Sequence, residues 1–239
     1  MVLYAGGALP ESSGGGGSST KYGMSLDGLL GDVDENGVLQ APTEEFDFVG
    51  GGIKDVSDYA LYYKFSRNSG VKTVSFPDLT KVSGNYACQN SFDKCSNLTS
   101  VDLSNLTTVS GNSGCSYMFY SCINLTSVDL SNLTTISGNS VCSYMFNYNY
   151  ALSSIDLSNL TTISGSNACS NMFYGCSKLP SISFPKLQEI NTSAFKNMFQ
   201  NCTALTEIHF RADMQATVEA LTGYSSKFGA TNATIYFDL

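Results

Sequence analysis

Eight cysteines are the most chemically versatile residues of this sequence, and they recur at two positions of a repeated pattern. The two series are Cys88, Cys115, Cys142 and Cys169, and Cys95, Cys122, Cys176 and Cys202. Cysteines of one repeat lie seven residues apart, which spans about 10 Å on a helical stretch, whereas a disulfide joins Cα atoms about 4.4–6.8 Å apart. Packed helices of neighbouring repeats would lie about 8–10 Å apart, which is again too far. A metal site is disfavoured because the sequence has one histidine and no CxxC motif. We predict buried free thiols that pack as small apolar residues.

Three aspartates occupy one position in three successive repeats, namely Asp102, Asp129 and Asp156, each within the phrase Asp-Leu-Ser-Asn. Stacked carboxylates repel one another, so each requires a cation, a basic ligand or a hydrogen bond from a nearby backbone amide. An Asp in such a phrase readily caps the following turn. The alternative is direct contact with a ligand, and both interpretations remain open.

Tyrosines cluster in the second half of the repeats, at Tyr117, Tyr120, Tyr144, Tyr148, Tyr150 and Tyr174. Aromatic side chains on a repeated surface suit contact with a carbohydrate or a protein. Tyrosine also packs half-buried between repeats without any ligand. The candidates for ligand binding are Tyr117, Tyr120, Tyr144 and Tyr174.

A half-match to a calcium loop lies near the N-terminus. Asp32, Asp34 and Asn36 have the alternate spacing of the first ligands of such a loop, but its twelfth position is Thr43 instead of Glu. Asn36-Gly37 between apolar residues also predicts a β-hairpin. Calcium is therefore the one cofactor that the sequence suggests, with a hairpin as the alternative.

A 27-residue repeat must position all of these side chains. The segment Ser100–Thr126 recurs almost unchanged at Ser127–Ser153 and Ser154–Pro180, with looser copies at Thr73–Thr99 and Ser181–Thr206 and a degenerate first copy at Phe46–Lys72. A fixed period of this length is typical of a solenoid, in which each coil buries its apolar side chains only against its neighbours.

Each repeat contains three kinds of segment. Val101 and Leu103 alternate with polar residues, which predicts a half-buried strand, and a second short extended segment ends at Val109. Apolar residues then follow at spacings of three and four, as from Cys115 to Phe119, which predicts one or two helical turns. Stacked coils should form a central phenylalanine column of Phe65, Phe92, Phe119, Phe146, Phe173 and Phe199.

The sequence divides into four parts. We expect a Gly/Ser-rich arm at 1–20, a small hairpin-like element at 21–45, the solenoid at 46–210 and a C-terminal cap at 211–239. The cap should contain a helix over Asp213–Thr222, which ends at Gly223, and a strand within Ala233–Leu239.

Composition restricts the classes of partner. Only 13% of residues are charged and the formal net charge is −8, which disfavours nucleic acids and anionic membrane surfaces because no basic stripe is visible. No apolar run approaches the roughly 18 residues of a membrane span. The N-terminal residues also lack the pattern of a signal peptide.

The repeat resembles a known family. The pattern M-F-x-x-C-x-x-L-x-S-[VI]-D-L-S, as from Met118 to Ser131, is similar to BspA-like leucine-rich repeats of bacterial surface proteins. The resemblance implies an α+β repeat fold, a right-handed leucine-rich-repeat solenoid of about six coils, displayed outside the cell for adhesion or recognition. Similar repeats also occur in bacteriophage-encoded proteins. The family offers no catalytic motif, and His209 has no catalytic partner in the sequence, so we expect no enzyme.

Two functions follow as expectations. The first is an extracellular or cell-surface module that binds a cell-surface glycan or protein through the solenoid surface. The alternative is a bacteriophage virion or tail-associated protein, displayed on the virion surface, whose N-terminal arm contacts other virion proteins.

Overall fold

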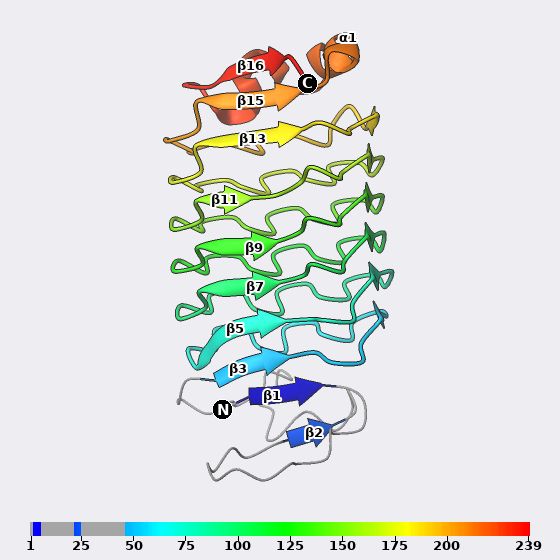
Figure 1. The fold of residues 1–239 in the computed structure, drawn as a ribbon, viewed down its shortest axis with the longest axis vertical. Coiled ribbons are helices and arrows are strands. Elements are labelled where there is room, and N and C mark those ends of the chain that lie inside the picture. Colours follow the sequence, from blue (N-terminus) through cyan, green and yellow to red (C-terminus); the bar gives the residue numbers. More distant parts are fainter. Residues whose placement is uncertain (1, 6–21, 25–45) are drawn as a thin grey trace.

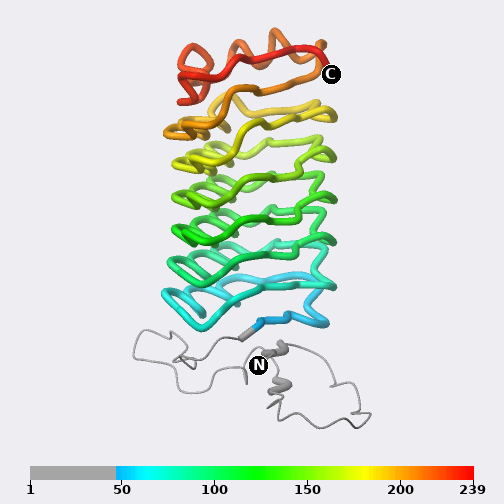
Figure 2. Tube along the Cα trace, turned by 60° about the vertical axis from the view of Figure 1, so that its left-hand side comes forward, coloured from blue at the N-terminus to red at the C-terminus, as the bar shows by residue number. Residues whose placement is uncertain are grey.

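The computed structural model describes residues 2–5, 22–24 and 46–239, and it confirms the predicted solenoid (Figure 1). Successive coils stack along the long axis of the molecule, and the C-terminal segment lies at one end of the stack (Figure 2). We number the coils 1 to 6, beginning at residues 46, 73, 100, 127, 154 and 181. Each coil contributes to three sides, namely a large sheet, a small sheet and a stretch of turns.

The large sheet has seven parallel strands in the order β11-β9-β7-β5-β3-β1-β2. They are β11 (Ser154–Ile155), β9 (Ser127–Asp129), β7 (Ser100–Asp102), β5 (Val71–Ser75), β3 (Phe46–Val49), β1 (Val2–Ala5) and β2 (Tyr22–Met24). From β5 to β11 the paired residues are 27 positions apart, as Ser100 is from Ser127. Val101 and Val128 point into the core, as the alternation predicts.

The small sheet has six strands, each of two residues, on the next side of the coils. They are β4 (Asp55–Val56), β6 (Lys81–Val82), β8 (Thr108–Val109), β10 (Thr135–Ile136), β12 (Thr162–Ile163) and β14 (Glu189–Ile190). Each pair has its second residue buried, as Val109 is, so this sheet closes the core with one apolar side chain per coil.

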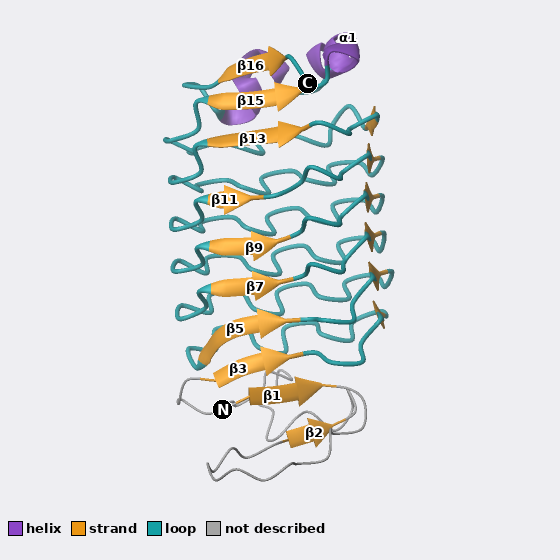
Figure 3. Cartoon of the chain, viewed as in Figure 1, coloured by secondary structure: helices purple, strands orange, loops and turns teal. Residues whose placement is uncertain are grey.

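The third side is a chain of turns, and the prediction of helical turns there is wrong (Figure 3). We call residues 58–67, 85–94, 112–121, 139–148, 166–175 and 192–201 the turn stretches. Their amides alternate between two acceptors: the Met118 amide donates to Cys115 O of its own coil at 3.1 Å, whereas the Phe119 amide donates to Met145 O of the next coil at 3.0 Å. Neighbouring coils are therefore hydrogen-bonded here, and not separated as packed helices would be.

The predicted phenylalanine column runs through the centre of the stack. Its neighbouring rings are nearly parallel, with interplanar angles of 2–11° and centroid distances of 4.9–6.1 Å. All six side chains are buried. An aromatic pair contributes about 0.5–1.5 kcal/mol beyond the burial of its area, so the column holds adjacent coils in register.

All eight cysteines are buried free thiols, as predicted. Those of the second series donate to phenylalanine carbonyls of the preceding coil, as Cys122 Sγ does to Phe92 O at 3.0 Å. Burial raises the pKa of Cys202 to about 12, so this thiol stays neutral near pH 7. In coil 4 the equivalent residue is Asn149, whose Nδ2 makes the same bond to Phe119 O at 2.9 Å. Its Oδ1 is buried and has no hydrogen-bond partner among the described residues.

Pro180 interrupts the large sheet. At this position of the other coils, a backbone amide donates to the preceding coil, as Ser153 does to Thr126 O at 3.3 Å. Proline has no N–H to donate. Strand β13 (Ser181–Phe184) consequently pairs with β15 (Glu207–Phe210) and β16 (Thr234–Phe237) in a separate three-stranded sheet, and not with β11.

The C-terminal cap covers the last coil. The predicted helix is confirmed with different bounds, as η1 (Ala212–Met214) and α1 (Gln215–Glu219), and the predicted strand is β16. Segment η2 (Tyr224–Gly229) then places Phe228 in the core. Phe228 O accepts the Phe199 amide at 3.0 Å, which replaces the bond that a further coil would supply.

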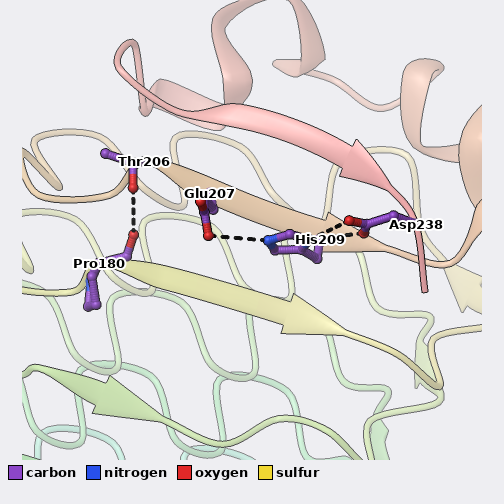
Figure 4. A network of polar contacts seen from close by, with 5 residues as sticks. All are labelled: Pro180, Thr206, Glu207, His209 and Asp238. Carbon is purple, nitrogen blue, oxygen red and sulfur yellow. Dashed lines mark hydrogen bonds and ion pairs between the residues drawn. The ribbon is translucent and has the colours of Figure 1, made fainter.

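His209 links the last two strands (Figure 4). Its Nδ1 lies 2.9 Å from Asp238 Oδ1 beyond β16, and its Nε2 lies 3.5 Å from Glu207 Oε2. The ring stacks on Tyr236 of β16 at 4.8 Å between centroids. The hydrogen bond to Asp238 raises the pKa of His209 above its usual value, against the opposing effect of partial burial, and Glu207 adds to the increase.

We expect an exchange of Asn149 and Cys122 types to show what the second cysteine series contributes. Asn149→Cys should stabilise the protein, since a buried unpartnered polar group costs about 1–3 kcal/mol. Cys122→Asn should destabilise it for the same reason. Urea denaturation of both variants measures the effect, and a less stable Asn149→Cys protein would contradict the explanation.

The cap should also lose stability as the pH rises. Because the pKa of His209 is higher in the folded state, its contribution is complete below the unfolded value of about 6.5 and disappears as pH rises through the folded value. Melting temperatures from about pH 5.5 to 8.5 measure this in wild type and His209→Gln. An equal pH slope in both proteins would show that His209 is not responsible.

Candidate recognition surface

The aspartate column lies on the large sheet, where each carboxylate caps the turn that follows it. Asp102 Oδ1 accepts the Ser104 amide at 3.0 Å. Asp129 and Asp156 make the equivalent bonds to Ser131 and Ser158, at 3.0 and 2.8 Å. Turn capping is therefore confirmed. Whether these carboxylates also contact a ligand is not decided by this geometry.

The environment of the aspartates differs along the column. Burial opposes ionisation of Asp102, but hydrogen bonds from Ser104 and Ser75 outweigh it and lower its pKa below the usual value. Asp129 and Asp156 are exposed and border a shallow depression of about 360 Å³ on the large sheet. The column is thus a set of ionised, mostly solvated carboxylates, each with a backbone partner.

The tyrosines lie on a different side of the coils, along the turn stretches. We call the outward side chains of these stretches, together with the adjacent Tyr150, the turn face. The four tyrosines proposed from the sequence are all part of it, and they are joined by Tyr59, Tyr62, Tyr63 and Tyr86 of coils 1 and 2. The aspartates and tyrosines consequently do not form one site.

Six of these tyrosines have a left-handed backbone, with φ between 55° and 59°: Tyr59, Tyr63, Tyr86, Tyr117, Tyr144 and Tyr148. Each turn stretch of coils 1 to 5 has three such positions, spaced four residues apart, as at Ser113, Tyr117 and Ser121 of coil 3. The left-handed conformation brings Cβ close to the following carbonyl, which costs an L residue about 1–2 kcal/mol. Asn and Gly tolerate it far better, and they occupy equivalent positions elsewhere, as Asn171 and Gly175 do.

Sequence reasoning missed this backbone feature, although a signal was present. Aligned repeats show Asn or Gly alternating with Tyr at the same position, as Asn90, Tyr117, Tyr144 and Asn171 do. Asn and Gly recurring at one repeat position indicate a positive φ. The apolar spacing around them instead suggested a helix.

Ring contacts fix most of these tyrosines. Tyr117 and Tyr144 stack with centroids 4.6 Å apart and an interplanar angle of 5°. Tyr59 and Tyr86 stack at 5.2 Å. These pairs direct their edges and hydroxyl groups outward, and Tyr59 remains 54% exposed.

A second group surrounds Tyr148 in coils 3 to 5. Its ring meets Tyr120 edge-on at 5.7 Å and Tyr174 edge-on at 5.3 Å, and Tyr150 lies at 5.9 Å. The Tyr174 hydroxyl accepts a hydrogen bond from Asn201 Nδ2 at 2.9 Å. Edge-to-face contacts leave part of some ring faces uncovered, and Tyr150 is 48% exposed.

The charges near the tyrosines are mostly positive. Lys94 Nζ lies 5.8 Å from the centroid of Tyr120, a cation–π contact, and Arg67 is exposed in the preceding coil. Asp93 is 6% exposed, and its Oδ1 has no hydrogen-bond partner among the described residues. Burial raises the pKa of Asp93, whereas a hydrogen bond to Ser66 and the charges of Lys94 and Arg67 oppose the increase.

The described residues form no group of three or more His, Cys, Asp or Glu side chains that could hold a metal ion. The calcium prediction at Asp32, Asp34 and Asn36 lies outside the residues that the structure describes. Within the described ranges, no helix has the length and apolar character needed to span a membrane.

Comparison with known proteins identifies the repeat. A family model described as BspA type leucine rich repeat region matches residues 62–198 in six copies. No curated protein matches the chain.

Several solved structures share the repeat architecture. A leucine-rich repeat protein from Bacteroides ovatus ATCC 8483 is 19% identical over 84% of this chain and 54% of its own, with a TM-score of 0.43. The T. pallidum leucine rich repeat protein is 17% identical over 83% and 71%, with a TM-score of 0.39. A leucine rich cell surface protein from Faecalibacterium prausnitzii A2-165 is 20% identical over 70% and 60%, with a TM-score of 0.30. This chain thus spans about half of the first of these proteins. By its matched repeats and its solenoid, the chain belongs to the BspA-type leucine-rich repeat family.

Proposed function

We propose that this protein is a non-enzymatic recognition module that binds a cell-surface glycan or protein through its turn face. Family membership supports the general role, since leucine-rich repeat solenoids serve as scaffolds for protein interaction and adhesion. The observation that carries the specific proposal is the set of six tyrosines with a left-handed backbone.

Packing alone does not account for these tyrosines. A stacked pair such as Tyr117 and Tyr144 contributes about 0.5–1.5 kcal/mol, which is less than the backbone cost of two residues at about 1–2 kcal/mol each. Asn171, the equivalent residue of coil 5, shows that the turn forms without an aromatic ring. Strained backbone positions concentrate at functional sites, where the rest of the structure compensates their cost.

The composition of the turn face suits recognition. Its left-handed positions hold tyrosine together with serine and asparagine, as at Ser113, Ser121 and Asn90. Tyrosine supplies a large amphipathic contact at low entropic cost, and serine and asparagine supply adaptable hydrogen bonds. Because hydrogen bonds to the next coil fix the backbone, the rings are pre-organised, which reduces the entropy lost on binding.

The aspartate column ranks second as a contact surface. Each of its carboxylates already has a structural role as a turn cap, so its presence needs no ligand. An extracellular or cell-surface location accompanies the proposed function. The virion alternative depends on residues 1–45, most of which lie outside the described ranges, and no observation in the described residues favours it.

Replacing Tyr117 and Tyr144 together by Asn should abolish binding while leaving the fold intact. Lost stacking and relieved backbone strain nearly cancel, so the free energy of unfolding should change by no more than about 1 kcal/mol. Flow cytometry of labelled protein on intact epithelial cells, and an array of cell-surface glycans, measure binding. Urea denaturation measures stability.

Asp129→Asn is the matched control, because an amide oxygen can still accept the Ser131 hydrogen bond. It should bind like wild type. Unchanged binding by the tyrosine variant, or loss of binding by Asp129→Asn alone, would contradict a site on the turn face.

A further inference from the structure

Residues that fit the left-handed backbone poorly are confined to one part of the turn face. Coils 1 to 4 have twelve left-handed positions in their turn stretches, and eight of these hold Tyr, Arg or Lys. Coils 5 and 6 have five, and all of them hold Asn or Gly: Asn167, Asn171, Gly175, Asn197 and Asn201. The backbone strain therefore locates the functional segment in coils 1 to 4, with coils 5 and 6 as a structural support.

Two of the eight residues are cations in neighbouring coils. Arg67 and Lys94 occupy the same repeat position, with φ of 61° and 56°, and both are exposed. The Arg67 amide donates to Asp93 O at 2.7 Å, so their backbones lie about one strand spacing apart, roughly 4.8 Å. Like charges this close repel each other. An anion placed between them relieves the repulsion.

The nearby acidic groups do not replace such an anion at the surface. Asp93 is buried beneath the two cations, and its position leaves both positive charges facing solvent. Asp58, at the corner of coil 1, already accepts the Asn85 amide at 2.6 Å through Oδ1. Lys64 adds a further positive charge to the same turn stretch.

We propose that the turn face of coils 1 to 4 binds an acidic polysaccharide, with Arg67 and Lys94 contacting its anionic groups and the tyrosines contacting its sugar rings. This inference rests on the proposed function of the turn face. The tyrosine rings and the cations recur at the coil spacing along the solenoid axis, so the surface matches an extended polymer rather than a small molecule.

The spacing of charge favours a glycan over a nucleic acid. Beyond Lys94, the same repeat position continues with Ser121, Tyr148 and Gly175, which are uncharged. A single-stranded nucleic acid carries one phosphate per nucleotide and is bound in grooves that are positive along their length. An acidic glycan with charge on only some of its sugars matches one charged end followed by neutral aromatic and hydroxyl groups.

The test compares defined polymers by isothermal titration calorimetry: heparin for sulfate, polygalacturonate for carboxylate, dextran as the neutral polysaccharide and oligo-dT as the nucleic acid. We expect binding to heparin or polygalacturonate, which identifies the anionic group, and no binding to dextran or oligo-dT. Binding should weaken as salt increases, because exposed charges are screened.

Arg67→Asn combined with Lys94→Asn should weaken this affinity about tenfold or more, because both charge contacts are lost while Asn tolerates the left-handed backbone. Lys196→Gln is the matched control, since Lys196 is exposed on the turn stretch of coil 6. It should leave affinity unchanged. Circular dichroism confirms that each variant is folded.

Three results would overturn the inference. Equal weakening by Lys196→Gln would indicate nonspecific attraction, and equal or tighter binding of oligo-dT would indicate a nucleic-acid surface. The third is that the Arg67 and Lys94 variant retains all binding whereas the Tyr117 and Tyr144 variant loses it. That outcome would leave the proposed function standing without an acidic ligand.

Discussion

Backbone hydrogen bonds between equivalent residues of successive coils are the interaction on which the rest of this structure depends. They run through the large sheet, the small sheet and the turn stretches, and from coil 2 to coil 5 they keep one register of 27 residues. Because every coil is placed on its neighbour in this way, identical residues stack directly. The phenylalanine column, the thiol-to-carbonyl bonds and the turn caps are consequences of that register.

The same register restricts what may stand at the corners of a coil. Gly138 approaches its neighbour so closely that a Cβ would lie 2.6 Å from Gly111 O of the preceding coil. Pro180 shows the opposite effect, since the loss of one N–H divides the large sheet although the core continues past it. Main-chain geometry is thus the stricter constraint, and apolar packing follows it.

Function is best sought where the sequence opposes this geometry. In the turn stretches, each left-handed position of coils 5 and 6 has a residue that suits it, whereas Tyr117, Tyr144 and Tyr148 do not. The aspartates of the large sheet behave in the opposite way, because each satisfies a backbone amide beside it. A charged column on a repeated surface can therefore be structural, while a neutral aromatic one carries the stronger signal of recognition.

The amino-acid sequence determined the period, the core and the cap of this protein. Phe119 and its equivalents, the buried thiols and the capping by Asp102 follow from residue types at fixed positions of a repeat. The sequence did not determine the turn stretches, since apolar spacings of three and four occur both in helices and in consecutive turns. Bonds such as that from the Phe119 amide to Met145 O decide between them, and they join residues 26 positions apart. The left-handed tyrosines and the approach of Arg67 to Lys94 depend on that stacking, so only the tertiary structure reveals them.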